Sequence, residues 1–133
     1  MPKIEVTALD ILTSDNQYPD RLMEATSDII NNAEILAVEI TELLEHYGKR
    51  PKINSGFRTP EANKAAGGSI NSSHCYGRAV DFSDPKGEFG KWCIANVGVL
   101  ASLDLYIEDP QYTKNWLHCT NRKPRSGKIV FKP

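Results

Sequence analysis

The segment NSSHCYGRAVDF, residues 71–82, contains two side chains of the kinds that bind transition metals. His74 precedes Asp81 by seven positions, and Gly77 lies between them, so the intervening chain can fold back. Imidazole and carboxylate groups are both ordinary zinc ligands. Two ligands do not complete a site, however, and a third must come from elsewhere in the chain.

The chain has three histidines, which makes the search for a third ligand short. His46 lies at the end of an expected helix, where an imidazole interacts favourably with the helix dipole and needs no metal. His118 lies in WLHCT, inside an expected apolar strand, where a polar ring needs a partner. A satisfied core histidine is the ordinary interpretation of such a residue. Together with His74 and Asp81, however, it completes two histidines and one carboxylate, a set that leaves a fourth position for water, as in catalytic zinc sites.

The three cysteines, Cys75, Cys93 and Cys119, form neither a CxxC pair nor an even-numbered framework, and we interpret them as small buried thiols. Cys75 and Cys119 each adjoin a histidine. Adjacent side chains on a strand face opposite ways, so these thiols do not easily join the same metal. A closed structural site of cysteine and histidine is therefore disfavoured.

Length and charge limit the classes of protein to consider. A chain of 133 residues fits one domain, which we place at 1–133, with residues 1–20 as an N-terminal extension and 122–133 as a C-terminal basic strand. The 16 basic and 17 acidic residues nearly cancel, so charge gives no argument for a nucleic-acid partner. No secretory signal and no membrane-spanning apolar run are visible, so we expect synthesis in the cytoplasm and no membrane partner.

Hydrophobic periodicity predicts the elements that must position these residues. Apolar residues recur at steps of three and four from about residue 21 to 47, which predicts a long helix ended by Gly48. The alternative is a shorter helical turn that precedes or interrupts it near Ser27 and Asp28, since both are good N-cap types. Thr59-Pro60-Glu61 has the cap, proline and carboxylate of a helix start. Further predictions are a short strand within 52–58, a loop at 69–77, a helix at 89–101, and strands at 78–83, 103–108, 116–120 and 128–132. Early helices and late strands predict an α+β fold with a mostly antiparallel sheet.

Strand alternation gives the expected orientation of the candidate ligands. Asp81 should point with Ala79, while its neighbours on the strand point into a core. His118 should likewise share one face with Trp116 and Thr120. A ligand pair from a loop and the strand that follows it, completed by a residue of another strand, is sterically reasonable.

Four blocks of the sequence resemble the zinc D,D-peptidase superfamily: SGFR at 55–58, the glycine pair at 67–68, SxHxxGxAxD at 72–81, and WLH at 116–118. This superfamily includes D-alanyl-D-alanine carboxypeptidases and dipeptidases and the L-alanyl-D-glutamate endopeptidases of bacteriophage lysis systems. The signalling domain of hedgehog proteins shares the fold. The likeness spans roughly residues 30–120.

The resemblance implies that His74, Asp81 and His118 bind one zinc ion per chain. It also implies a general base on the strand or turn before the last histidine. Glu108 holds that position, and Asp109 is a rival because the loop to His118 varies in length among relatives.

The resemblance further implies that Arg58 meets a substrate carboxylate or the developing oxyanion. Without it, Arg58 would be interpreted as a surface partner of Glu61, and Glu108 as an exposed turn charge. Ser72 either supports His74 or touches substrate. Trp116 is assigned to substrate binding, although an aromatic residue at strand spacing also fits a core.

The function implied is a zinc metallopeptidase that hydrolyses peptide bonds in the stem peptides of bacterial peptidoglycan, of L-Ala–D-Glu or D-Ala–D-Ala type. We expect a monomeric phage or prophage product that reaches the cell wall with a holin or as part of the virion. The alternative is a non-catalytic zinc-binding protein of the same fold, with a structural or interaction role. Mutation of Glu108 separates the two.

Overall fold

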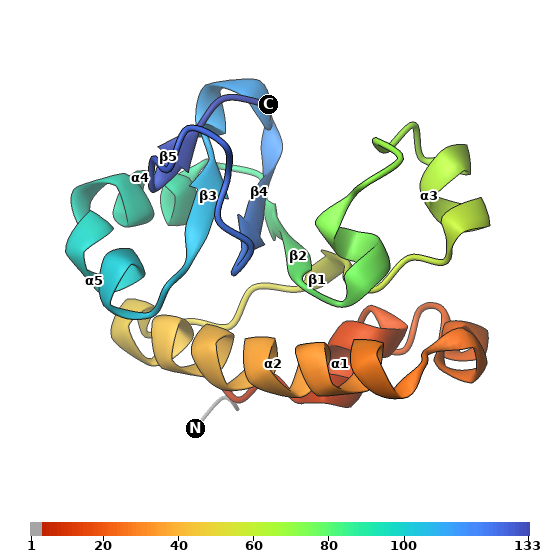
Figure 1. The fold of residues 1–133 in the computed structure, drawn as a ribbon. Helices are drawn as coiled ribbons and strands as arrows, with labels where there is room; N and C mark the ends of the chain where they lie inside the picture. The colour runs from red at the N-terminus through yellow and green to blue at the C-terminus, as the bar shows by residue number, and fades with distance from the viewer. Residues whose placement is uncertain (1–3) are drawn as a thin grey trace.

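Five strands form one sheet at the centre of the fold, in the order β1-β2-β4-β3-β5 (Figure 1). The computed structural model describes residues 4–133. The strand bounds are β1 Ile53–Ser55, β2 Ala79–Asp84, β3 Tyr106–Glu108, β4 Asn115–Thr120 and β5 Val130–Phe131. All neighbouring strands are antiparallel except β3 and β5, which are parallel. The α+β class with a mostly antiparallel sheet is thus confirmed.

The long predicted helix is present as α2, Ser27–Tyr47, but it begins later than predicted. Thr26 caps it by accepting a hydrogen bond from the Ile29 amide, and Gly48 ends it with a φ of 84°. The preceding residues form a separate 3-10 helix, η1 Pro19–Glu24. Ala25 is extended between the two helices, so the chain is interrupted next to Ser27, where the alternative prediction placed a break.

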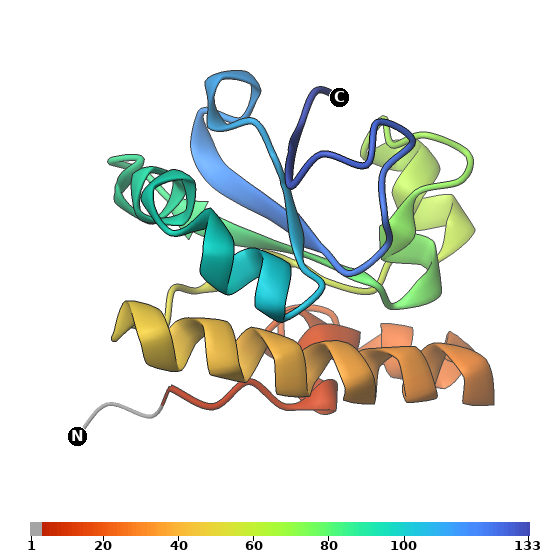
Figure 2. The same ribbon diagram turned by 60° about the vertical axis from the view of Figure 1, so that its left-hand side comes forward.

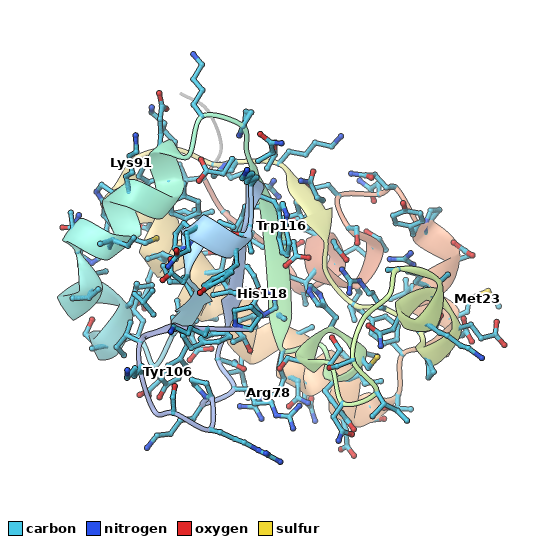
Figure 3. The ribbon with its side chains drawn as sticks, turned by 90° about the horizontal axis from the view of Figure 1, so that it is seen from above. Met23, Arg78, Lys91, Tyr106, Trp116 and His118 are labelled. Carbon is cyan, nitrogen blue, oxygen red and sulfur yellow. The ribbon has the colours of Figure 1, made fainter. Side chains whose placement is uncertain are left out.

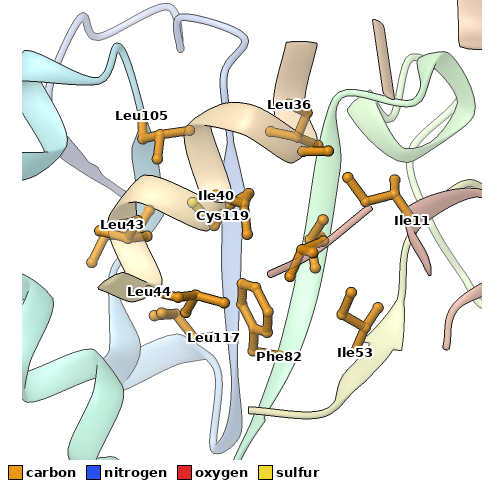
Figure 4. Packing of buried hydrophobic residues seen from close by; sticks show 14 of the residues in the cluster. Ile11, Leu36, Ile40, Leu43, Leu44, Ile53, Phe82, Leu105, Leu117 and Cys119 are labelled. Carbon is orange, nitrogen blue, oxygen red and sulfur yellow. The ribbon is translucent and has the colours of Figure 1, made fainter. Parts of the chain in front are cut away.

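The main core lies between α2 and one face of the sheet. Helix α2 runs beneath the strands (Figure 2), and its buried side chains pack against Phe82 of β2 and Leu117 of β4 (Figure 4). The buried residues of α2 follow helical spacing: Ala33, Leu36, Ala37, Ile40, Leu43 and Leu44. Since one face of the sheet is occupied in this way, only the other face is left to carry a site.

Residues of the expected N-terminal extension also belong to this core. Helix α1, Ala8–Thr13, is capped by Thr7, whose side chain accepts a hydrogen bond from the Asp10 amide. Ile11 and Leu12 are buried, and α1 lies alongside α2 (Figure 1). This helix was not predicted, because it spans fewer than two turns and shows too little periodicity.

The shorter helices lie around the sheet. Their bounds are α3 Pro60–Ala65, η2 Ser73–Tyr76, α4 Glu88–Ala95, α5 Val97–Ser102 and η3 Pro110–Tyr112. The start of α3 at the Thr59 cap is confirmed. The single helix predicted at 89–101 is wrong: the chain breaks at Asn96, whose side-chain amide bonds to the Trp92 carbonyl and so competes with helical backbone pairing. Within residues 4–133, no helix has both the length and the apolar character needed to cross a bilayer.

Candidate metal centre

Two of the three predicted metal ligands and Glu108 lie in one row of side chains that runs across the sheet from strand to strand. Asp81 on β2 is paired with Ser55 on β1 and with His118 on β4. Ile107 of β3 is paired with Cys119, so the same register places Glu108 beside His118. Glu108 is in turn paired with Phe131 of β5. All five of Ser55, Asp81, His118, Glu108 and Phe131 line the same cleft.

The alternation of the strands puts this row on the open face of the sheet. Val80 and Phe82, on either side of Asp81, are fully buried in the core. Leu117 and Cys119 occupy the same positions beside His118 and are also fully buried. Figure 3 looks onto the open face, with His118 near its middle and Trp116 further along the strand. The strand orientation predicted for both ligands is therefore the one observed.

His74 reaches the row from the 3-10 helix η2. The Ser72 hydroxyl accepts a hydrogen bond from the His74 amide and caps this turn. His74 is 3% exposed, and Nδ1 of its ring lies 2.8 Å from the Gly56 carbonyl oxygen. Because a carbonyl only accepts, Nδ1 carries a proton and donates it to Gly56, and Nε2 faces Asp81 Oδ1 at 3.2 Å.

The two oxygens of Asp81 have different partners. Oδ1 lies 3.2 Å from His74 Nε2 and 2.8 Å from His118 Nδ1. Oδ2 accepts a hydrogen bond from the Arg58 guanidinium at 3.2 Å. Burial acts to raise the pKa of Asp81, but hydrogen bonds and charge from His118 and His74 outweigh it and hold the pKa below the ordinary value. The carboxylate is therefore ionised at neutral pH.

The three predicted ligands lie close enough to bind one ion. One donor atom from each of His74, Asp81 and His118 falls within 4.8 Å of the other two. Two imidazoles and a carboxylate are the donor set of catalytic zinc sites. The Gly56 carbonyl holds the His74 ring from its far side, as an outer partner of a metal-binding histidine does. His74 Nε2 and His118 Nδ1 both face Asp81 Oδ1, at 3.2 Å and 2.8 Å, so the donor atoms of the three side chains converge on one point. These residues fit zinc.

The SGFR segment supports this centre through every one of its residues. Ser55 Oγ accepts from Arg58 Nε at 2.9 Å. Gly56 lies against α1 so closely that a Cβ there would overlap the Ile11 carbonyl oxygen. Phe57 is 2% exposed and anchors the segment in the core. Glycine is thus required at position 56 to bring the carbonyl that orients His74 into place.

Arg58 is oriented by three partners rather than by Glu61. Besides Ser55 and Asp81, its guanidinium lies 3.4 Å from the Asn63 side chain of α3. Asn63 is itself buried and donates to the Ser69 carbonyl at 2.7 Å. A guanidinium has five N–H donors, so two remain for a ligand in the cleft. Sequence reasoning missed Asn63, because an asparagine in a short polar helix gives no signal of burial.

The structure separates the two candidates for the general base. Glu108 is half-buried in the cleft beside His118. Burial raises the pKa of Glu108; His118 opposes this and the negative charge of Asp81 adds to it. The Asp109 carboxylate instead caps η3, where it accepts from the backbone and side chain of Gln111. Only Glu108 of the pair faces the metal centre.

The cleft above the row has a volume of about 990 Å³. Ser72 and Trp116, both predicted to contact substrate, line it. One wall is the loop at 66–73, and the facing wall is the segment 122–125. Of the SGFR segment, Ser55 and Arg58 also line the cleft, whereas Phe57 does not, because its side chain is part of the core.

The remaining histidine and the cysteines lie apart from the metal centre. His46 is exposed in the last turn of α2, as predicted. Cys93 and Cys119 are buried free thiols, and burial raises the pKa of Cys93 to about 12. Cys75 is only partly buried, contrary to prediction, because the short η2 helix leaves it at the surface.

Comparison with known families gives a match over most of the chain. The family model described as Peptidase M15 matches residues 7–120, a range that contains α1, all three candidate ligands and Glu108. No curated protein and no solved structure shows significant similarity to the chain.

Proposed function

The chain belongs to the peptidase M15 family, and from this membership we propose that it is a zinc-dependent peptidase that hydrolyses peptide bonds in the stem peptides of bacterial peptidoglycan. One observation carries the proposal. His74, Asp81 and His118 converge within 4.8 Å on the floor of a cleft that Glu108 also lines. We further propose a monomer with one zinc ion per chain.

His74, Asp81 and His118 would hold the metal. When bound, zinc supplies a Lewis acid that activates water for attack and polarises a carbonyl oxygen. Contacts within the chain orient the metal-binding atoms. The Gly56 carbonyl fixes the His74 ring. Arg58 bonds only to Oδ2 of Asp81, so Oδ1 remains directed at both histidines.

Glu108 is the group that moves the proton. In amide hydrolysis the attacking water loses a proton as its oxygen bonds to the carbonyl carbon, and the leaving nitrogen gains one as the C–N bond breaks. Glu108 can accept the first proton and donate it in the second step. Its raised pKa suits a group that must do both.

Arg58, Ser72 and Trp116 would position the peptide. The two free N–H groups of Arg58 can bind either a substrate carboxylate or the negative charge that develops on the carbonyl oxygen. Ser72 lines the cleft next to His74, while its hydroxyl already supports the η2 turn. Trp116 lies on the same face of β4 as His118 and offers an apolar surface for substrate.

Peptidoglycan is the proposed substrate because its stem peptides combine amide bonds with free carboxylates, which match the cationic side chains of this cleft. The scissile bond is of the L-Ala–D-Glu or the D-Ala–D-Ala type. A role in phage lysis, with delivery by a holin or within a virion, is the biological setting we propose.

Digestion of purified peptidoglycan, with and without a chelator, tests this function. We expect new amino termini, identified by mass analysis, that vanish with the chelator and return with added zinc. Products that persist in the chelator, or no products with the zinc-loaded protein, would contradict the proposal. A non-catalytic role for the same fold predicts bound zinc but no products.

A further inference from the structure

The cleft has an excess of positive charge that the metal centre does not explain. Its lining contains four lysine and arginine side chains, namely Arg58, Arg122, Lys123 and Arg125, against two acidic side chains, those of Asp81 and Glu108. The whole chain, in contrast, has 16 basic and 17 acidic residues. The excess is therefore local, and three of the four cations come from one wall, the segment 122–125.

The base of this wall is fixed by a network of hydrogen bonds. Arg78 donates to the side chain of Asn121 at 2.9 Å and to its carbonyl at 3.0 Å. Asn121 in turn donates to Glu39 of α2 at 2.7 Å. At the far end of the loop, Gly127 turns the chain with a φ of 70° and donates to the Pro124 carbonyl. Both ends of the segment 122–125 are thus held by contacts within the fold.

One of the three cations is used to join the walls. Arg122 donates to the Asn71 carbonyl in the opposite wall at 2.6 Å and lies over the Tyr76 ring. Lys123 and Arg125 are exposed, and neither has an ion pair or a side-chain hydrogen bond to any residue within 4–133. Two unpaired cations therefore line a cleft that already contains a peptide-cleaving site.

We propose that Lys123 and Arg125 form a subsite for a second carboxylate of the peptide substrate, away from the scissile bond. The inference rests on the proposed peptidase function and adds specificity for anionic peptides. Both residues lie outside the range 7–120 matched by the family model. Cations grouped in a cleft raise the local concentration of an anionic substrate and favour its binding.

The test uses two peptides that share the bond cleaved in the peptidoglycan digest. One has a free remote carboxylate, and the other has a primary amide in its place. We expect the zinc-loaded wild type to favour the carboxylate peptide in kcat/KM, mainly through KM. The double variant K123Q/R125Q should lose about fivefold of this preference, as expected for two partly exposed ion pairs. The preference should also fall with added salt.

The matched control is K86Q/K91Q, which removes the same charge elsewhere. Lys86 and Lys91 are exposed and do not line this cleft; Figure 3 shows Lys91 on α4, across the sheet from Arg78. The control should keep the wild-type preference. Equal losses in both double variants, or an unchanged preference in K123Q/R125Q, would overturn the subsite.

A binding measurement separates this proposal from the peptidase function. Fluorescence anisotropy measures the binding of the same two peptides, each carrying a fluorescent label, to two zinc-loaded proteins. One is the E108Q variant, and the other is the triple variant E108Q/K123Q/R125Q. Tighter binding of the carboxylate peptide that depends on the two cations supports the subsite even if the wild type hydrolyses neither peptide. Hydrolysis without any such binding preference overturns the subsite and leaves the peptidase function standing.

Discussion

At the scale of single residues, Asp81 is the point where the metal centre and the cleft are joined. Its Oδ1 faces both histidines and its Oδ2 accepts from Arg58, so a change in any partner alters the orientation of the carboxylate. Residue types and their order in the sequence were enough to predict His74, Asp81 and His118 as neighbours. Residue types alone did not reveal that the Gly56 carbonyl holds His74, because a backbone group has no signature in sequence.

Replacement of Glu108 by glutamine should lower kcat by about 10²–10⁴-fold, because the amide cannot accept the proton of water. The zinc content should stay at the wild-type value, since Glu108 is not among the three ligands. The two readouts are peptide hydrolysis and metal analysis of the purified variant.

Asp109→Asn is the matched control for Glu108→Gln. The Asp109 carboxylate bonds to Gln111 at the start of η3 and faces away from the metal centre. Activity should remain close to that of the wild type. A large loss in Asp109→Asn together with an active Glu108→Gln would reverse the assignment of the base.

Glu39→Gln should change how stability depends on pH. Burial raises the pKa of Glu39 above its ordinary value; the hydrogen bond from Asn121 opposes this, and Asp104 adds to it. A carboxyl group whose pKa is higher in the folded than in the unfolded state lowers the free energy of unfolding as the pH rises. The loss begins near the unfolded pKa, about 4.3, and is complete above the folded pKa. Urea unfolding of both proteins at pH 4 and pH 7 should therefore show the wild type losing stability relative to Glu39→Gln at the higher pH. A difference independent of pH would contradict this.

At the scale of elements, the sequence predicted most helices and strands but not how the strands pair. The alternation of apolar and polar residues in the sequence predicted which face of β2 and of β4 packs against the core. The row from Ser55 to Phe131 depends on strand register and order, which are set by packing across the whole sheet. The break at Asn96 was missed because a side-chain hydrogen bond to the backbone outweighed a continuous apolar pattern. The break at Ala25 lies beside the interruption expected near Ser27 and Asp28.

Gly56→Ala should destabilise the fold and weaken zinc binding together. The new methyl group would overlap the backbone of Ile11, so β1 must move away from α1 and carry the Gly56 carbonyl away from His74. We expect a lower midpoint of urea unfolding and a zinc affinity reduced about 10–100-fold, the usual effect of losing an outer partner.

Gly98→Ala is the control for Gly56→Ala. Gly98 lies within α5, has an ordinary backbone conformation, and has open space where a Cβ would be. Alanine should therefore leave zinc binding unchanged and stabilise the protein by up to about 1 kcal/mol. If Gly56→Ala behaved like this control, the close approach of β1 to α1 would have no role in orienting His74.

At the scale of the whole molecule, the fold gives one face of the sheet to the core and the other to the site. Helix α2 fills the first face, and the loop at 66–73 and the segment 122–125 rise on either side of the second. The candidate ligands come from η2, β2 and β4, which are brought together only in the folded chain. Metal binding is then coupled to folding, so removal of zinc should lower the melting temperature. Sequence reasoning gave the ligands but not the cleft walls, because these are loops placed by contacts distant in the sequence.

Zinc content of the wild type, His118→Ala and His46→Ala, each purified and dialysed against the same buffer, tests the central claim most directly. The account predicts one zinc per chain in the wild type and in His46→Ala, and far less than one in His118→Ala. His46 is the appropriate comparison, because it is an exposed histidine at the end of α2, outside the group formed by His74, Asp81 and His118. Equal zinc loss in both variants, or full zinc retention in His118→Ala, would contradict a metal centre built on these three side chains.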